Sequence, residues 1–182
     1  MDPIALWHAE HQDFSRLLDL LDREVAVFHD GGQPNYGLMT DIVQYLRHFP
    51  DQLHHAREDA AFACLVKRDP SLGPVAEALI REHKVIAEAG ETLLEYLSEI
   101  VGEAVLRRKA VEAAAALYAN YYRMHIDREE AEILSRAAKL LTQEDWAIVA
   151  AAVPDKVDPL FGGACNTRYR ELRREIATLA ES

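Results

Sequence analysis

Apolar residues recur three and four positions apart along most of the chain, which is the period of an α-helix with one buried face. The segments "FSRLLDLLDREV" (14–25) and "AGETLLEYLSEIV" (89–101) show this spacing, and their Leu, Ala, Glu and Arg content favours helix. No segment shows the alternating β-branched pattern that is typical of strands. The pattern predicts helices at about 3–28, 37–68, 74–101, 104–139, 142–153 and 165–181.

Clusters of glycine and proline separate the predicted helices. The clear breaks are "HDGGQPNYG" (29–37), "RDPSLGP" (68–74) and "VPDKVDPLFGG" (153–163), and "IVGEA" (100–104) is a weaker one. Because short connections favour antiparallel neighbours, we predict an all-α protein built on an antiparallel up-down-up-down four-helix bundle. The bundle is expected over residues 1–141, with a C-terminal helical extension, residues 142–182, packed on it.

Two local signals refine these helices. Pro50 falls inside the second helix and lacks a backbone N–H group, so we expect a kink or a restart near residues 46 to 50. Thr142 and Asp145 have the spacing of an N-cap residue and its partner three positions later, so a helix is expected to begin at this point.

Composition excludes several classes of function. A chain of 182 residues can bury a sizeable core, and its 31 acidic against 20 basic residues give a formal net charge of −11. Nucleic acids and anionic membrane surfaces attract basic patches, so neither is expected as a partner. Cys64 and Cys165 form no paired motif, which argues against a disulfide framework or a thiolate zinc site. With no signal peptide and no apolar run of about 20 residues, the sequence predicts a soluble cytoplasmic protein.

An internal repeat contains most of the candidate chemistry. The dipeptide Glu10–His11 recurs as Glu82–His83, at an offset of 72 positions. The heptapeptide "HHAREDA" (54–60) recurs as "HIDREEA" (125–131), at an offset of 71, with four of the seven positions identical. The identical pairs are His54/His125, Arg57/Arg128, Glu58/Glu129 and Ala60/Ala131, and Asp59/Glu130 conserves the charge. Each half is therefore predicted to be a helical hairpin with one histidine on its first helix and H-x-x-x-E on its second.

The H-x-x-x-E spacing places an imidazole and a carboxylate on one face of a helix. Residues four apart lie about 6 Å apart along the axis and nearly in line, so both side chains can reach a common point. One such pair in a glutamate-rich helix is usually a solvated face, but two pairs with matching flanks indicate a shared metal site. The donor set of imidazoles and carboxylates suggests iron, manganese or zinc. The alternative is a duplicated bundle whose repeat merely kept its surface residues.

Six of these residues resemble the motif set of a known family. In chain order they are His11, His54, Glu58, His83, His125 and Glu129. Their order on four predicted helices resembles the hemerythrin-like, or HHE, cation-binding domain, over about residues 3 to 140. The resemblance implies a bundle around a non-haem diiron centre, with manganese or zinc as the less favoured metals. In the implied centre His11 and His54 bind one iron, His83 and His125 bind the other, and Glu58 and Glu129 bridge them.

The chain departs from oxygen-carrying hemerythrins at two points. Ala87 stands four residues beyond His83, where those proteins have a second histidine, and an H-x-x-x-E motif replaces H-x-x-x-x-D on the fourth helix. Both departures count against dioxygen transport. His55 is the best replacement for the missing ligand, and its alternative is a supporting or exposed side chain.

Three further choices stay open on the sequence alone. The bridge on the fourth helix could be Glu129 or its neighbour Glu130. His8 lies one turn before His11 and would either support the site or lie exposed. Either Tyr118 or Tyr121, seven and four residues before His125, would lie beside the site or be an ordinary core aromatic.

These features together predict a diiron protein that binds or senses dioxygen, nitric oxide or peroxide. The chain offers no dedicated nucleophile, cofactor loop or substrate motif, so no catalytic residue is assigned and an enzyme is not favoured. The alternatives are a diiron redox enzyme of the oxidative or nitrosative stress response, acting on peroxide or nitric oxide or in iron–sulfur cluster repair, and an iron-responsive interaction module. In such a module the C-terminal helices would contact a protein partner or a second copy of the chain in a homodimer.

Overall fold

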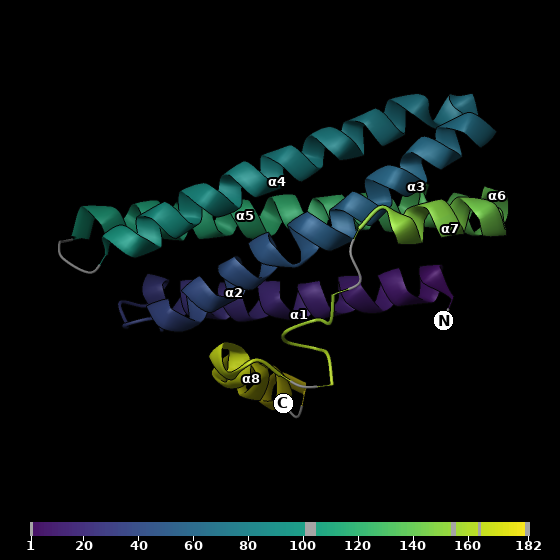
Figure 1. Cartoon of the computed structure of the whole chain (residues 1–182). Coiled ribbons are helices and arrows are strands. Elements are labelled where there is room, and N and C mark those ends of the chain that lie inside the picture. The colour runs from purple at the N-terminus through teal and green to yellow at the C-terminus, as the bar shows by residue number, and fades with distance from the viewer. Residues whose placement is uncertain (1, 101–104, 154–155, 164, 181–182) are drawn as a thin grey trace.

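The computed structural model describes residues 2–100, 105–153, 156–163 and 165–180, and every regular element within them is helical. Figure 1 shows the path of the chain. The α-helices are α1 (Pro3–His29), α2 (Tyr36–His48), α3 (His55–Arg68), α4 (Gly73–Glu99), α5 (Val105–Glu132), α6 (Leu134–Leu140), α7 (Gln143–Ala151) and α8 (Arg170–Ala180). A π-helical turn (Pro50–His54) joins α2 to α3, and short 3-10 helices span Pro70–Leu72 and Thr167–Tyr169.

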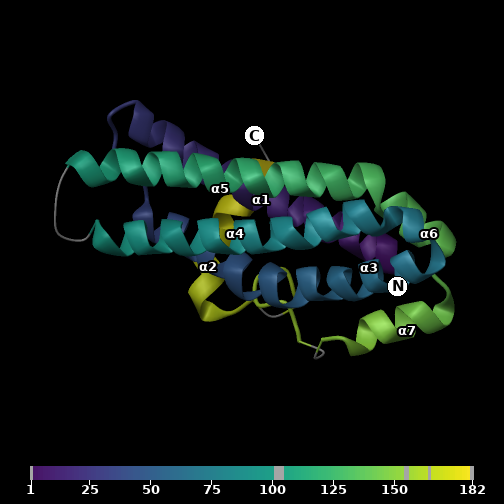
Figure 2. The same cartoon turned by 90° about the horizontal axis from the view of Figure 1, so that it is seen from above.

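Four long helical segments form the predicted bundle. α4 and α5 lie side by side along their length, α1 packs on α5, and α2 packs on both α1 and α4 (Figure 2). The second segment of the bundle is α2 together with α3. The predictions of an all-α protein and of a four-helix bundle are confirmed. Among the described residues, no helix is both long and apolar enough to cross a membrane.

The bundle core is divided into two apolar clusters, and the polar residues of the repeat lie between them. On α1, Trp7 belongs to one cluster and Phe14 to the other, with buried His11 between them. The same arrangement recurs around His83 on α4. Apolar layers above and below therefore isolate these histidines from bulk water, and every polar group there needs a partner inside the protein.

The predicted break at Pro50 is confirmed, and it takes the form of a π-helical turn. α2 ends at His48, and the backbone N–H of His55 donates to the carbonyl of Pro50, five residues earlier. Pro50 has no N–H group, so a regular α-helical ladder cannot pass through it. A π-helical turn holds more residues than an α-helical turn, so consecutive side chains diverge less. As a result His54 and His55 are both buried, with exposed fractions of 1% and 4%.

Two predicted helix boundaries are wrong. The fourth helix does not run unbroken to residue 139, because α5 ends at Glu132 and α6 begins at Leu134, with the fully buried Ile133 (φ −114°) at the break between them. The last helix does not begin at residue 165. The side chain of Asn166 accepts a hydrogen bond from the N–H of Arg168 and so caps the 3-10 helix that begins at Thr167, and α8 follows from Arg170. The weak break predicted at 100–104 falls largely on residues outside the described part of the chain.

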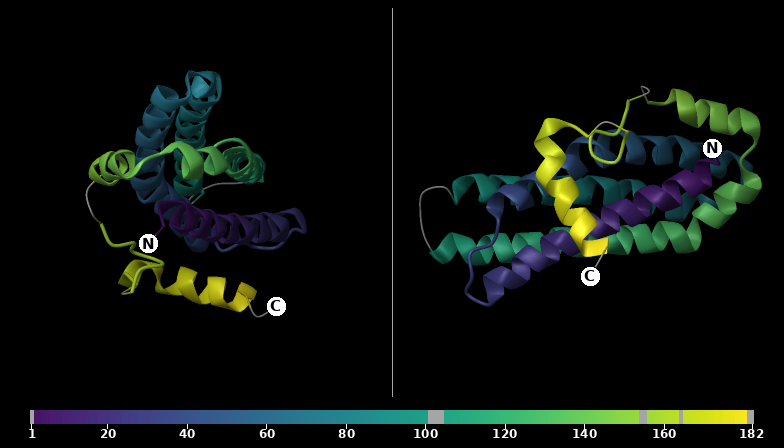
Figure 3. Two further views of the ribbon diagram at one scale, coloured as in Figure 1. Left: turned by 90° about the vertical axis from the view of Figure 1, so that its right-hand side faces the viewer. Right: turned by 90° about the horizontal axis from the view of Figure 1, so that it is seen from below.

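The C-terminal helices lie on the outside of the bundle. The predicted helix start at Thr142 is confirmed by a capping box, in which Thr142 accepts from Asp145 N–H and Asp145 Oδ2 accepts from Thr142 N–H. α7 packs on α3, and α8 lies across α1 and α2 (Figure 3). The division into a bundle and an extension at residue 142 stays a prediction.

Candidate metal centre

The histidines and glutamates of the repeat converge between the two apolar clusters. Each side chain is at least 93% buried, and together they come from all four segments of the bundle. The converging residues are His11 on α1, His54 at the end of the π-helical turn, His55 and Glu58 on α3, His83 on α4, and His125 and Glu129 on α5.

One group of donors surrounds a point near α1. It consists of His11, His54, Glu58 and Glu129, whose ligand atoms all lie within 4.8 Å of one another. The Nε2 atoms of His11 and His54 are 3.0 Å apart, and Glu58 Oε1 lies 2.9 Å from His54 Nε2. Ligands about 2 Å from one ion lie at most about 4 Å apart, so these atoms can share a cation.

A second group surrounds a point near α4. It consists of His55, Glu58, His83 and His125, again with ligand atoms within 4.8 Å of one another. Glu58 Oε2 lies 3.6 Å from His83 Nε2. Glu129 Oε1 lies 3.2 Å from His125 Nε2, while Glu129 Oε2 lies 3.5 Å from His11 Nε2. Each of the two glutamates therefore directs one oxygen toward each group.

These groups contain buried polar atoms that have no hydrogen-bond partner. Both carboxylate oxygens of Glu58 and of Glu129 are in this state, as are the Nε2 atoms of His83 and His125. Leaving one buried polar atom unpaired costs about 1–3 kcal/mol, and an unpaired charge costs more. A cation bound among these donors would offset that cost, so the residues present fit a metal.

The protonation of the metal-free groups follows from their mutual attraction. Burial alone would lower the pKa of His54, but Glu58 and Glu10 more than offset this and raise it to about 9. Burial alone would raise the pKa of Glu58, but His54, His11 and His83 hold it well below its usual range. Without metal, protons on the histidines thus supply part of the positive charge that the carboxylates require.

The outer nitrogens of the histidines are held by carboxylates. A metal-binding histidine commonly donates its other ring N–H to such an acceptor, which fixes the ring and increases its basicity. Four of the histidines follow this pattern through Nδ1. The pairs are His54 with Glu10 (2.6 Å), His125 with Glu82 (3.1 Å), His11 with Glu130 (2.8 Å) and His83 with Asp59 (2.9 Å).

This outer network explains why the repeat extends beyond the metal-binding positions. Glu10 bonds both His54 and Arg57, the latter at 2.7 Å, and Glu82 bonds both His125 and Arg128, the latter at 2.6 Å. In each half, the glutamate beside the lone histidine orients the histidine of the other helix. In the sequence, the repeated Glu-His dipeptide and the arginines at equivalent positions of the repeat were the signals for these contacts, although no role was predicted for these residues.

The Glu82→Gln variant is expected to bind metal about 10- to 100-fold more weakly, because a neutral amide loses the ion pair with Arg128 and holds His125 less firmly. Glu10→Gln should behave alike, since it is the equivalent residue of the other half. Metal affinity can be measured by competition with a chelator, with exposed Glu88 on α4 changed to Gln as the control. Unchanged affinity in both variants would show that these contacts do not support the site.

His55 breaks the symmetry of the two halves. Its ring stacks on that of His83 at 4.1 Å and 8°, and its Nδ1 lies 3.4 Å from Asp51 Oδ1. Burial and the neighbouring His83 lower the pKa of His55 well below its usual value, so it is neutral and able to coordinate. The equivalent position in the second half is Ile126. His55 is therefore a buried member of the second donor group, not an exposed side chain.

The structure also separates the alternatives at the edge of the site. Glu129, not Glu130, belongs to a donor group, because Glu130 bonds the outer nitrogens of His8 and His11 and is 32% exposed. His8 is 46% exposed and takes part only through Glu130. The tyrosine beside the site is Tyr122, whose ring lies 5.8 Å from that of His55, and not Tyr121. Tyr122 lies three residues before His125 and on the same face of α5 as Tyr118.

A comparison with protein families gives one match. The sequence model described as the hemerythrin HHE cation binding domain matches residues 2–137. That range contains every residue of both donor groups and of the outer carboxylate network. No curated protein matches the chain.

Proposed function

Because the chain belongs to the hemerythrin HHE cation-binding domain family, we propose that it holds two iron ions and binds or senses a small ligand such as dioxygen or nitric oxide. The observation that carries this proposal is the sharing of Glu58 by both donor groups. A single-ion site would gather its donors around one point. Here one carboxylate contributes an oxygen to each of two points, and Glu129 spans the same two points from the opposite helix.

The donor types are compatible with iron. Imidazole and carboxylate suit iron, manganese and zinc alike, whereas thiolates would favour zinc or a cluster. Cys64 is buried in the apolar cluster around Trp7 and belongs to neither donor group. Unlike zinc, iron changes oxidation state, so when bound it could exchange electrons with dioxygen or nitric oxide.

The two donor groups are unequal, which indicates where a small ligand would bind. The group near α4 contains three histidines, whereas the group near α1 contains only His11 and His54. A cleft of 450 Å³ opens on the side of His11 and is lined by His8, Ser15 and Glu130. A ligand entering there would reach the group with fewer histidines, and the Glu130 carboxylate would hold the His11 ring in place during its entry.

Anaerobic reconstitution with ferrous iron is expected to give about two irons per chain, followed by reversible changes in the visible spectrum on exposure to dioxygen or nitric oxide. Metal analysis and absorption spectroscopy measure both. Fewer than one iron per chain, without charge-transfer bands, would contradict the diiron proposal. Sustained consumption of peroxide or nitric oxide would replace the binding function with an enzymatic one.

A further inference from the structure

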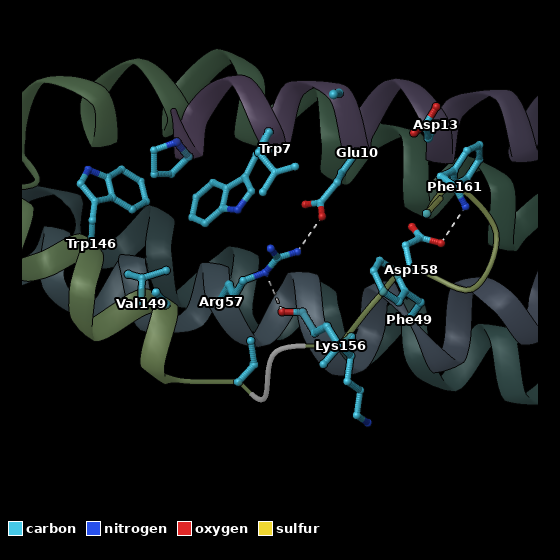
Figure 4. A pocket seen from close by; sticks show the side chains of 17 residues that line it. Trp7, Glu10, Asp13, Phe49, Arg57, Trp146, Val149, Lys156, Asp158 and Phe161 are labelled. Carbon is cyan, nitrogen blue, oxygen red and sulfur yellow. Dashed lines mark hydrogen bonds and ion pairs between the residues drawn. The ribbon is translucent and has the colours of Figure 1, made fainter. Parts of the chain in front are cut away.

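A second cleft lies between the bundle and the C-terminal segment, separate from the donor groups. It has a volume of 760 Å³ and is formed by α1, α3, α7 and residues 156–162 (Figure 4). This volume is within the range of about 300–1,000 Å³ that is typical of small-molecule sites. Only Glu10 and Arg57 of the outer network reach its wall, so the cleft can hold a molecule that does not touch a metal.

One end of the cleft is aromatic. Trp7 and Trp146 meet edge to face, with ring centroids 5.5 Å apart and an interplanar angle of 72°. Figure 4 shows Val149 beside Trp146 at this end. Trp7 is only 1% exposed, whereas Trp146 is half-buried, so a planar or alkyl group placed there would bury apolar area mainly against the Trp146 ring.

The other end of the cleft is acidic. Asp13 and Asp158 line it beside Phe161, and the Glu10 carboxylate lies between them and the tryptophans (Figure 4). Asp158 is held there by hydrogen bonds from the Tyr45 hydroxyl and from the backbone N–H groups of Leu160 and Phe161.

The cations around the cleft are differently placed. Arg57 is held in the wall by Glu10 at 2.7 Å and by the carbonyl of Leu53. Arg16 bonds Asp13 at 2.6 Å but is itself 51% exposed. Figure 4 shows the Lys156 side chain pointing away from Glu10 and Asp158. Both arginines are thus already paired with carboxylates, and Lys156 is directed away from the acidic end.

We propose that this cleft binds a small primary amine with an apolar body, seating the body against Trp146 and the ammonium group beside Asp13 and Asp158. The ammonium would gain ion pairs with the two carboxylates, and the Trp146 ring would add dispersion attraction to the body. The proposal concerns a site distinct from the metal centre and does not depend on which metal is bound there.

The test uses intrinsic fluorescence, because the chain has only two tryptophans and both line the cleft. The metal-loaded full chain is titrated with 2-phenylethylamine and, separately, with 3-phenylpropionate, which has the same ring and the opposite charge. The amine is expected to change tryptophan emission saturably and to bind at least ~10-fold more tightly than the acid. Equal affinity for the two probes, or no saturable change with either, would overturn the proposal.

Matched variants test the location. Asp13→Asn should weaken amine binding by ~5-fold and leave 3-phenylpropionate binding no weaker, as expected for loss of one partly exposed ion pair. Asp19→Asn changes an acidic residue of α1 that instead bonds Arg123 outside the cleft, and it should bind the amine like the unmodified chain. Binding of the amine to Trp146→Ala is measured by calorimetry, and most of this binding should be lost. Equal effects of Asp13→Asn and Asp19→Asn would refute the proposed seat of the ammonium group.

Discussion

The Glu58→Gln variant is expected to lose most of its metal during purification, with an affinity at least ~100-fold below that of the unmodified chain. Glu58 is completely buried and belongs to both donor groups, and its two oxygens face the ring nitrogens of His11, His54 and His83. Glutamine has nearly the same volume but is neutral, so the change removes the charge that two cations would share. Metal content per chain is the measurement, and exposed Glu77 on α4 changed to Gln is the control.

The neighbouring glutamates of α5 sharpen this test. Glu129→Gln should cause a comparable loss, because its two oxygens also span both donor groups. Glu130→Gln should retain at least one metal ion per chain, because Glu130 bonds only the outer nitrogen of His11 and the exposed His8. If Glu130→Gln loses as much metal as Glu129→Gln, the assignment of the two residues is wrong.

The metal-free protein is expected to lose stability as the pH rises from 7 to 9. In the folded state the pKa of His54 is raised to about 9 and that of His83 to about 11, from an unfolded value of about 6.5. Above pH 6.5 these histidines are neutral in the unfolded chain but stay largely protonated in the folded one. Folding therefore takes up protons, and the stabilisation that is fully present below pH 6.5 is lost progressively as the pH rises. A loss on the order of 3 kcal/mol is expected, measured by denaturant unfolding of chelator-treated protein.

Metal binding should show the opposite dependence on pH. The same histidines must release their protons before they can coordinate, so metal affinity should increase as the pH rises from 6 to 8.

For the prediction on metal-free stability, the control is the His54→Gln variant, whose stability should fall less steeply between pH 7 and 9. Metal-free stability that is flat, or that rises over this range, would show that the buried histidines are neutral without metal.

Local periodicity determined much of this protein. The helices follow from apolar spacing and from glycine and proline breaks, and the pairs His54/Glu58 and His125/Glu129 follow from the geometry of one helix turn. The repeat identified the matching partners, because two copies of the same motif must serve the same role in each hairpin. These inferences needed only contacts between residues close in sequence, or a comparison of one segment with another.

Tertiary structure decided the remainder, because it depends on which helices face each other and how they are rotated. The choice of Glu129 over Glu130 required the rotation of α5 against α1, and the role of Glu10 required the packing of α1 on the π-helical turn. Likewise, the contact of Tyr122 with His55 and the cleft that Trp7 and Trp146 line bring together residues from distant segments. Sequence spacing fixes directions within one helix, but only packing fixes the angles between helices, and these angles determine which side chains meet.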